Sequence, residues 1–276
     1  MKRTIQLIGL LLLIIAGQFA YGQTDKEKAL EKGKQAVKLE DEGKFDEAIQ
    51  LLNEAQKLDP DCMSYPNELA YSYYSKQEYK TAINYLESIT NHPKVDDQVF
   101  QLLGNAYDNL EKTDKALEVY DMGLKKFPNS GKLYLEKGNI YWGKKEYDKA
   151  LPFYEQGIKV DPTFPSNYYR AAKIYCSTTE EVWGMIYGEI FMNIERNSER
   201  TAKISKLLYD TYKSEIKFTA ENSVSVSFSK NATITTHDLK DPGKVKLPFG
   251  VGVYEPTLMF SMLSVRSIDI NSLDTI

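Results

Sequence analysis

Side chains that could support nucleophilic, acid–base or metal chemistry are scarce in this sequence. Its 276 residues include two histidines and two cysteines. His92 precedes Pro93 and is expected in a surface turn, whereas His237 with Asp238 and Asp241 could bind a cation or simply form a polar hairpin loop. No H-E-x-x-H, G-x-S-x-G, phosphate-loop or paired C-x-x-C motif is present. We therefore expect no enzyme activity, no catalytic residue, no metal site and no cofactor.

Charged residues are nearly balanced in number. The chain has 35 lysines and arginines against 39 aspartates and glutamates, which gives a formal net charge of -4. The positive charges are scattered among negative ones, whereas nucleic-acid surfaces collect Lys and Arg on one face. We therefore expect no nucleic-acid partner. Apolar residues make up 42% of the chain, which is enough to form a folded core.

The first 22 residues have the order of a secretory signal peptide. Two cations in the first three residues precede an apolar segment at 5–16 and the small-x-small sequence Ala20-Tyr21-Gly22. The alternative is an uncleaved membrane anchor, but the run is short of the roughly 20 apolar residues that a spanning helix needs. We predict cleavage after Gly22, export to the periplasm or the outside of the cell, and no membrane span in the mature chain.

Alanine recurs at intervals of 34 residues, and other columns share this spacing. One column holds only Ala or Gly, and another holds aromatic residues or Leu. Small side chains let two antiparallel helices approach closely, while large ones fill the space between them. The three columns are Ala48, Ala82, Ala116 and Ala150; Ala36, Ala70, Gly104, Gly138 and Ala172; and Leu39, Tyr73, Tyr107, Tyr141 and Tyr175.

These columns resemble the tetratricopeptide repeat, in which Leu-Gly, Tyr, Ala, an aromatic residue and Pro occupy set positions. The third repeat shows the pattern best, with Leu103-Gly104, Tyr107, Ala116, Tyr120 and Pro128. The resemblance covers roughly residues 29–196. It implies a mainly α fold, a right-handed α-solenoid of helix pairs. With the signal segment, it is typical of an exported tetratricopeptide-repeat protein of Gram-negative bacteria.

The register also predicts helix ends and the state of the cysteines. Pro60, Pro128 and Pro162 lack an amide proton and should follow the ends of second helices. Cys62 and Cys176 fall three repeats apart, much farther than the ~7 Å between Cα atoms that a disulfide allows. We therefore expect two separate thiols.

After residue 217 the helical periodicity gives way to alternation typical of strands, with Val224, Val226 and Phe228 separated by polar residues. We expect a turn at 241–243, a further strand at 244–253, and an apolar segment at 258–265 that either type of element could contain. The predicted organisation is signal peptide 1–22, lead-in 23–28, repeats 29–62, 63–96, 97–130 and 131–164, degenerate repeat 165–197, capping helix 198–217 and β-containing tail 218–276.

The free face of each first helix is the candidate binding site. A helix turns 100° per residue, so the packed stripe leaves an opposite stripe exposed. In repeats two to four this stripe lacks Lys and Arg and holds amides and aromatics, which can bond a partner's backbone and offer large contact area. In the proteins that this sequence resembles, first helices line a groove that binds an extended segment. The predicted groove residues are Asn67, Tyr71, Tyr74, Gln101, Asn105, Asp108, Asn139, Trp142, Tyr169 and Lys173.

Several alternatives stay open for the function. The stripe aromatics could pack between repeats without binding anything. The leading hypothesis is an exported scaffold that binds an unidentified protein or peptide. One alternative is a docking module for an envelope assembly factor or enzyme whose active part is the tail. Another is a spacer in which the chain's own tail fills the groove. Capture of a terminal carboxylate by the clamp known in some repeat domains is not supported, since the matching positions hold Gln101, Leu102 and Glu136.

Overall fold

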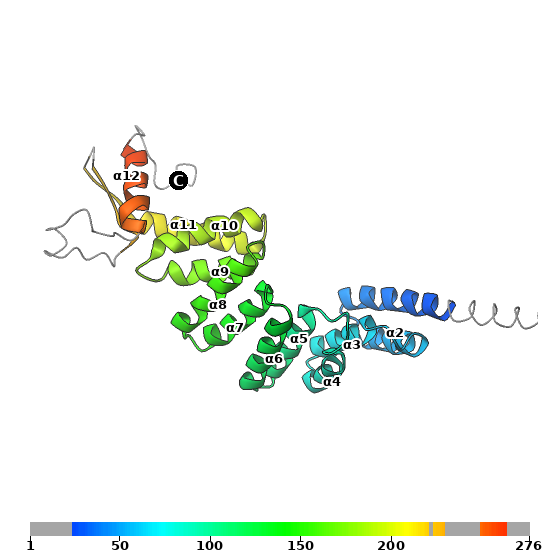
Figure 1. The fold of residues 1–276 in the computed structure, drawn as a ribbon. Coiled ribbons are helices and arrows are strands. Elements are labelled where there is room, and N and C mark those ends of the chain that lie inside the picture. The colour runs from blue at the N-terminus through cyan, green and yellow to red at the C-terminus, as the bar shows by residue number, and fades with distance from the viewer. Residues whose placement is uncertain (1–23, 221–222, 230–248, 264–276) are drawn as a thin grey trace, which may run out of the picture. The chain divides into compact units, whose positions relative to one another are not determined.

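The computed structural model describes residues 24–220, 223–229 and 249–263, and most of these are helical (Figure 1). The predicted signal peptide, His237 and the turn at 241–243 lie outside the described residues. The chain divides into two compact units, Met1–Pro128 and Asn129–Ile276. The predicted fold class, a mainly α solenoid of helix pairs with a small tail, is confirmed.

The first unit consists of consecutive helix pairs. In each pair the first helix packs against the second, and α2 and α4 also pack against the first helix of the next pair. The helices are an unlabelled one at 24–41, drawn in dark blue, then α2 Phe45–Leu58, α3 Ser64–Ser75, α4 Tyr79–Ile89, α5 Asp97–Asn109 and α6 Thr113–Lys126.

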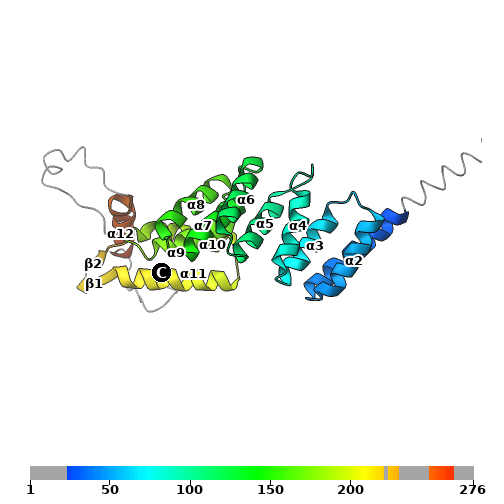
Figure 2. The ribbon, with the colours of Figure 1, turned by 90° about the horizontal axis from the view of Figure 1, so that it is seen from below.

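The second unit continues the pattern and ends in a cap. Helix α11 lies alongside α9 and α10, as Figure 2 shows. Both Pro128 and Pro162 follow a second helix within two residues of its end, as predicted. The elements are α7 Gly131–Gly143, α8 Tyr147–Val160, α9 Pro165–Tyr175, α10 Glu181–Ile194, α11 Glu199–Glu215, β1 Ile216–Ala220, β2 Ser223–Val226, η3 Gly250–Tyr254 and α12 Glu255–Leu263.

The small-residue column lies where the two helices of a repeat cross. All the alanines of both small-residue columns are fully buried. In repeats three and four the column holds glycine because a tyrosine ring occupies the crossing. A Cβ on Gly104 would lie 2.1 Å from Tyr120 Cε1, and one on Gly138 would lie 2.4 Å from Tyr154 Cε1. Only glycine leaves room for these rings.

The turn between the two helices of a repeat uses a left-handed residue in one column. Gly43, Gln77, Glu111 and Lys145 are 34 apart and have φ between 60 and 73°. The backbone N–H of the following residue then bonds a carbonyl five positions back, for example Lys112 N to Tyr107 O at 3.0 Å. This is the bond of a Schellman helix end, which satisfies a carbonyl that the helix leaves open.

The tail differs in part from the sequence prediction. Strand β2 covers part of the alternation expected at 224–228, and it pairs antiparallel with β1, a partner that the sequence did not predict, with Ile216 opposite Val226. The expected strand at 244–253 is wrong for its described residues, since Gly250–Tyr254 is a π-helix that runs into α12. A π-turn places Phe249 and Tyr254 on one side, where their ring centroids lie 6.5 Å apart. We attribute the π-helix to the packing of these rings, which outweighs the preference of the alternating valines for a strand.

The tail is attached to the stack through buried groups. Phe228 is fully buried, and its ring meets Tyr212 and Tyr254 edge-on at 5.6 and 6.0 Å between centroids. Glu255 Oε1 accepts hydrogen bonds from the backbone N–H groups of Phe228 and Ser229, at 2.8 and 2.6 Å. The described part of the tail therefore closes the end of the second unit.

Candidate peptide-binding surfaces

All ten predicted groove residues lie on first helices, and none is fully buried. In the first unit six of them lie on α3 and α5. In the second unit four lie on α7 and α9. The first group is Asn67, Tyr71, Tyr74, Gln101, Asn105 and Asp108, and the second is Asn139, Trp142, Tyr169 and Lys173.

Two of the predicted amides are engaged within their own repeats. Tyr120 donates its hydroxyl to Asn105 Oδ1 at 2.6 Å, and Tyr154 donates to Asn139 Oδ1 at 3.2 Å. The Asn139 amino group also donates to Glu136 Oε2 at 2.9 Å. The carbonyl oxygen of each amide therefore helps to hold a tyrosine ring in place, which uses one of its two lone pairs.

The other first-unit residues are arranged differently. Tyr71 is exposed, and Tyr74 packs edge-on against Tyr79 with ring centroids 5.3 Å apart. Its hydroxyl accepts a hydrogen bond from Asn109 Nδ2 at 3.0 Å. Asn67 Oδ1 is buried, and among the described residues it has no hydrogen-bond donor. Of the two predicted aromatic residues in this unit, Tyr71 is exposed and Tyr74 is partly buried.

In the second unit, cations and aromatic rings alternate along α7, α9 and α11. The Arg170 guanidinium lies 4.8 Å from the ring centroid of Trp142, and the Lys173 ammonium lies 5.3 Å from the same ring. Lys173 also lies 5.4 Å from the Tyr169 ring, and the Arg200 guanidinium lies 5.2 Å from it. We call Trp142, Arg170, Lys173, Tyr169 and Arg200 the cation–aromatic row.

The row includes two residues that the sequence did not predict. Arg170 lies beside the predicted stripe on α9. Arg200 comes from α11, outside the repeats, where it pairs with Glu195 and donates to Ser166 Oγ at 3.0 Å. The ion pair holds the pKa of Glu195 below its usual range. Helix α11 begins 34 residues after α9, but Arg200 then aligns with Ser166, which is not a position of the predicted stripe, so the stripe did not identify Arg200.

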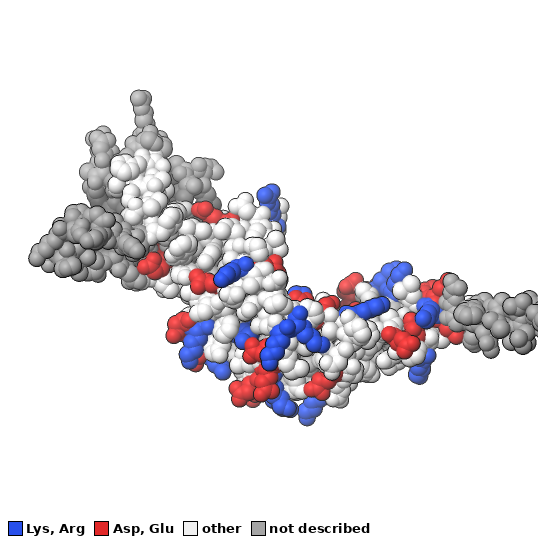
Figure 3. Space-filling view, viewed as in Figure 1, with Lys and Arg blue, Asp and Glu red and all other residues white. Residues whose placement is uncertain are grey.

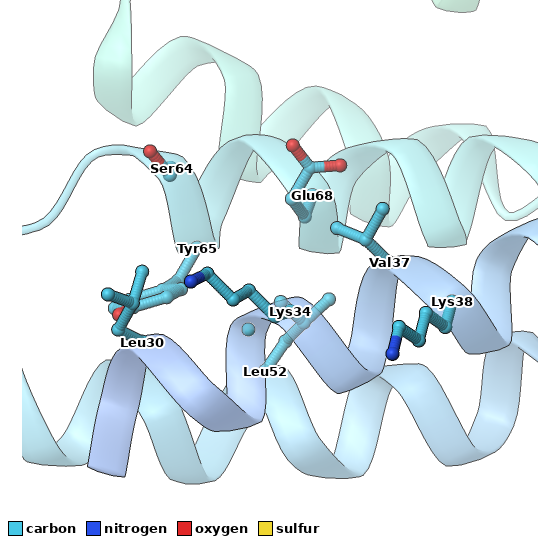
Figure 4. A pocket seen from close by; sticks show the side chains of 9 residues that line it. Leu30, Lys34, Val37, Lys38, Leu52, Ser64, Tyr65 and Glu68 are labelled. Atoms are coloured by element: carbon cyan, nitrogen blue, oxygen red, sulfur yellow. The ribbon is translucent and has the colours of Figure 1, made fainter. Parts of the chain in front are cut away.

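The first unit contains a pocket that the sequence did not predict. It has a volume of about 450 Å³ and lies between the helix at 24–41 and α3, with Leu52 of α2 behind them (Figure 4). Its lining is mainly apolar. Figure 4 shows Leu30 and the Lys34 amine beside Tyr65 at one end, and Val37 near Glu68 at the other. The 34-residue spacing could have predicted that Val37 belongs to the free stripe, because Val37 stands 34 residues before Tyr71.

Two carboxyl groups lie close together at this pocket, and one of them, Glu68, lines it. Glu40 is 7% exposed and accepts a hydrogen bond from Ser72 Oγ at 2.5 Å. Burial raises the pKa of Glu40 to about 7, and nearby Glu68 and Asp41 add to the effect. Burial also raises the pKa of Glu68. The carboxyl on the pocket wall is therefore less readily ionised than a surface glutamate.

The histidine and the two cysteines in the described part of the chain lie apart from one another and form no shared reactive site. His92 lies in the turn after α4, and its Nδ1 accepts a hydrogen bond from Lys94 N at 3.1 Å. Cys62 and Cys176 are free thiols, and burial raises the pKa of Cys176 to about 11. Within the described ranges, no group of three His, Cys, Asp or Glu side chains is placed to hold a metal ion.

Figure 3 shows basic and acidic side chains interspersed on the viewed face of each unit. Of the helices that the structure describes, none combines the length and apolar character needed to cross a membrane.

Three stretches of the chain match family descriptions of the tetratricopeptide repeat, at residues 34–95, 98–130 and 131–164. Two curated proteins are similar over part of their length. The heat shock protein STI1 of Saccharomyces cerevisiae is 36% identical over 109 residues, which cover 37% of this chain and 18% of STI1. The repeat-containing protein YpiA of Bacillus subtilis is 28% identical over 101 residues, which cover 37% of this chain and 23% of YpiA. The matches thus span less than a quarter of either relative.

Two solved structures share the fold. The tetratricopeptide-repeat protein TTC0263 of Thermus thermophilus has a TM-score of 0.53 at 19% identity, covering 65% of this chain and 98% of its own. PilF of Pseudomonas aeruginosa has a TM-score of 0.55 at 16% identity, covering 69% of this chain and 90% of its own. The 34-residue columns, the helix pairs and the matched stretches agree, and the chain therefore contains tetratricopeptide repeats.

Proposed function

We propose that this protein is a non-catalytic scaffold that binds a partner polypeptide on the first helices of its repeats. The observation that carries the proposal is the cation–aromatic row of the second unit. Its rings offer large contact area at little entropic cost, and its cations can meet carboxylates or backbone carbonyls of a partner. Stacked repeats with such surfaces are typical of protein–protein interaction scaffolds.

We further propose that the scaffold acts after export, in the periplasm or outside the cell. The support is the order of charged, apolar and small residues in the first 22 positions. The alternative function, with an active part in the tail, has no specific observation in its favour. The described tail residues bury Phe228 and bond Glu255 to the backbone, which is the role of a cap.

The chain has two tryptophans, which provide a matched test. Trp142 lies in the cation–aromatic row, and Trp183 lies on the second helix α10 and is 37% exposed. We would select peptides from a phage-displayed random library on the purified wild-type chain and then measure their affinity for each variant by fluorescence anisotropy. Trp142→Ala should weaken binding by ~2 kcal/mol, whereas Trp183→Ala should leave it nearly unchanged.

Melting curves of both variants show whether the fold is retained. If Trp142→Ala melts at a lower temperature but binds the peptides normally once folded, Trp142 has only a packing role and the cation–aromatic row is not the binding site. If the library yields no peptide that the wild type retains, the proposed function is wrong.

A further inference from the structure

The pocket of the first unit differs from the cation–aromatic row because large aliphatic side chains are exposed at it. Leu30 is 54% exposed and Val37 is 42% exposed, and both belong to the helix at 24–41. Tyr65 forms the floor, and Gly33 makes this possible, since a Cβ there would lie 2.8 Å from Tyr65 Cε1. The hollow has the size and apolar lining of a site for a bulky side chain.

The rim of the pocket carries positive charge. Lys34 and Lys38 stand on the same helix and line the opening. Among the described residues, no carboxylate lies within ion-pair distance of either ammonium group, whereas the neighbouring Lys32 is paired with Glu54 at 2.6 Å. The two lysines outnumber the one carboxyl group that lines the pocket, Glu68, whose pKa is raised by burial. The rim therefore favours an anionic partner.

We propose that this pocket holds a large apolar side chain of a partner peptide whose neighbouring residues are aspartate or glutamate. The apolar side chain enters between Leu30, Val37 and Tyr65, and the flanking carboxylates meet Lys34 and Lys38. An apolar anchor in a pocket with charges at its rim is the arrangement in which a few residues carry most of the affinity of an interface. The inference rests on the proposed function and names the chemistry of the partner at one site.

The test uses the peptides selected by the library on the wild-type chain. Their consensus should contain a large apolar residue beside Asp or Glu. For a labelled peptide of that sequence, Val37→Glu places a charge in the pocket and should weaken binding at least about tenfold. Met122 on α6 is 50% exposed and gives the matched control, so Met122→Glu should have no effect. If Val37→Glu impairs folding, Leu30→Glu replaces it.

A charge exchange tests the rim. The double variant Lys34→Glu, Lys38→Glu should prefer a peptide in which lysines replace the acidic residues, while the wild type should prefer the acidic form, by severalfold in each case. Equal preference in both proteins overturns the proposed partner chemistry.

Other outcomes separate this inference from the proposed function. If peptides bind and respond to Trp142→Ala but not to Val37→Glu, the pocket proposal fails and the scaffold proposal stands. If Val37→Glu converts a dimer into a monomer in sedimentation without changing peptide binding, a second copy of this chain occupies the pocket and the proposal is wrong. If no peptide binds at all, both proposals fail.

Discussion

Two tyrosine hydroxyls between helices donate to glutamates of the preceding repeat at the same spacing in sequence. Tyr107 of α5 donates to Glu87 of α4 at 2.5 Å, and Tyr175 of α9 donates to Glu155 of α8 at 2.7 Å. Both pairs are 20 residues apart in sequence and join one repeat to the next. The hydrogen bond to the Glu87 carboxylate raises the pKa of Tyr107 to about 12. A large ring can thus be packed between helices without leaving its hydroxyl unsatisfied.

Glu40 gives a prediction about pH at the residue scale. The folded chain holds the Glu40 proton up to about pH 7, whereas an ordinary glutamate loses it near 4.5. Between these values the folded state binds more protons, so the free energy of unfolding should fall as the pH rises. One pKa unit corresponds to 1.36 kcal/mol, so the loss should be about 1 to 3 kcal/mol. Glu40→Gln should raise the melting temperature at pH 8 and change it little at pH 5.

The control for this prediction is Glu42→Gln, because Glu42 is exposed and pairs with Lys44 at 2.7 Å. Its removal should not raise the melting temperature at pH 8. A lower melting temperature of Glu40→Gln at pH 8 would mean that the ionised Glu40 side chain stabilises the folded state, which contradicts a raised pKa.

At the scale of the helix pair, the residue at the helix crossing and the side chain that faces it must be complementary in size. Repeats one and two combine alanine with leucine, as in Ala70 and Leu86, whereas repeat three combines Gly104 with Tyr120. Gly104→Ala should therefore destabilise the fold by ~1 to 3 kcal/mol through overpacking. Adding Tyr120→Leu should recover part of this loss, so that the double variant is more stable than the sum of the single changes. Urea unfolding of the four proteins measures the coupling, and strict additivity would contradict it.

The turn within each repeat offers a stabilising substitution. Glu111 has a φ of 60°, which is unfavourable for a residue with a Cβ. Glu111→Gly should relieve this strain, with part of the gain offset by the greater freedom of glycine in the unfolded chain. We expect a net stabilisation of up to about 1 kcal/mol by thermal melting. The same change at exposed Glu118, inside α6, should destabilise by a similar amount, and a loss of stability at Glu111 would show that the turn does not favour glycine.

The elements that could be predicted from sequence are those with a repeated pattern. The alanine column predicted the helix pairs correctly because each alanine is buried where the two helices of a repeat cross. The tail has no second copy for comparison. Its residues 250–254 contain valines that alternate with other residues, yet a Cβ on Gly250 would lie 1.9 Å from Ser229 Oγ. This tertiary contact, which the local sequence does not reveal, accompanies a π-helix where a strand was expected.

At the scale of the whole molecule, each candidate surface combines residues from elements that are distant in the sequence. The free stripe identified Trp142, Tyr169 and Lys173, because they obey the helical period within a repeat. Arg200 joins them from α11, and Leu52 reaches the pocket from a second helix, so neither follows the stripe rule. Periodicity predicts which face of a helix is free, but the partners that fold onto that face depend on packing between elements.

The first 22 residues give a prediction about export. A signal peptidase recognises small residues after an apolar segment, and Ala20-Tyr21-Gly22 meets this requirement. We expect mass spectrometry of the secreted or periplasmic protein to give an N-terminus at Gln23, directly before the first described helix, which begins at residue 24. Replacing Ala20 and Gly22 with large residues should block cleavage and retain the chain at the membrane. Soluble cytoplasmic protein with an intact Met1 would contradict export, whereas retained but uncleaved wild-type chain would support the alternative of a membrane anchor.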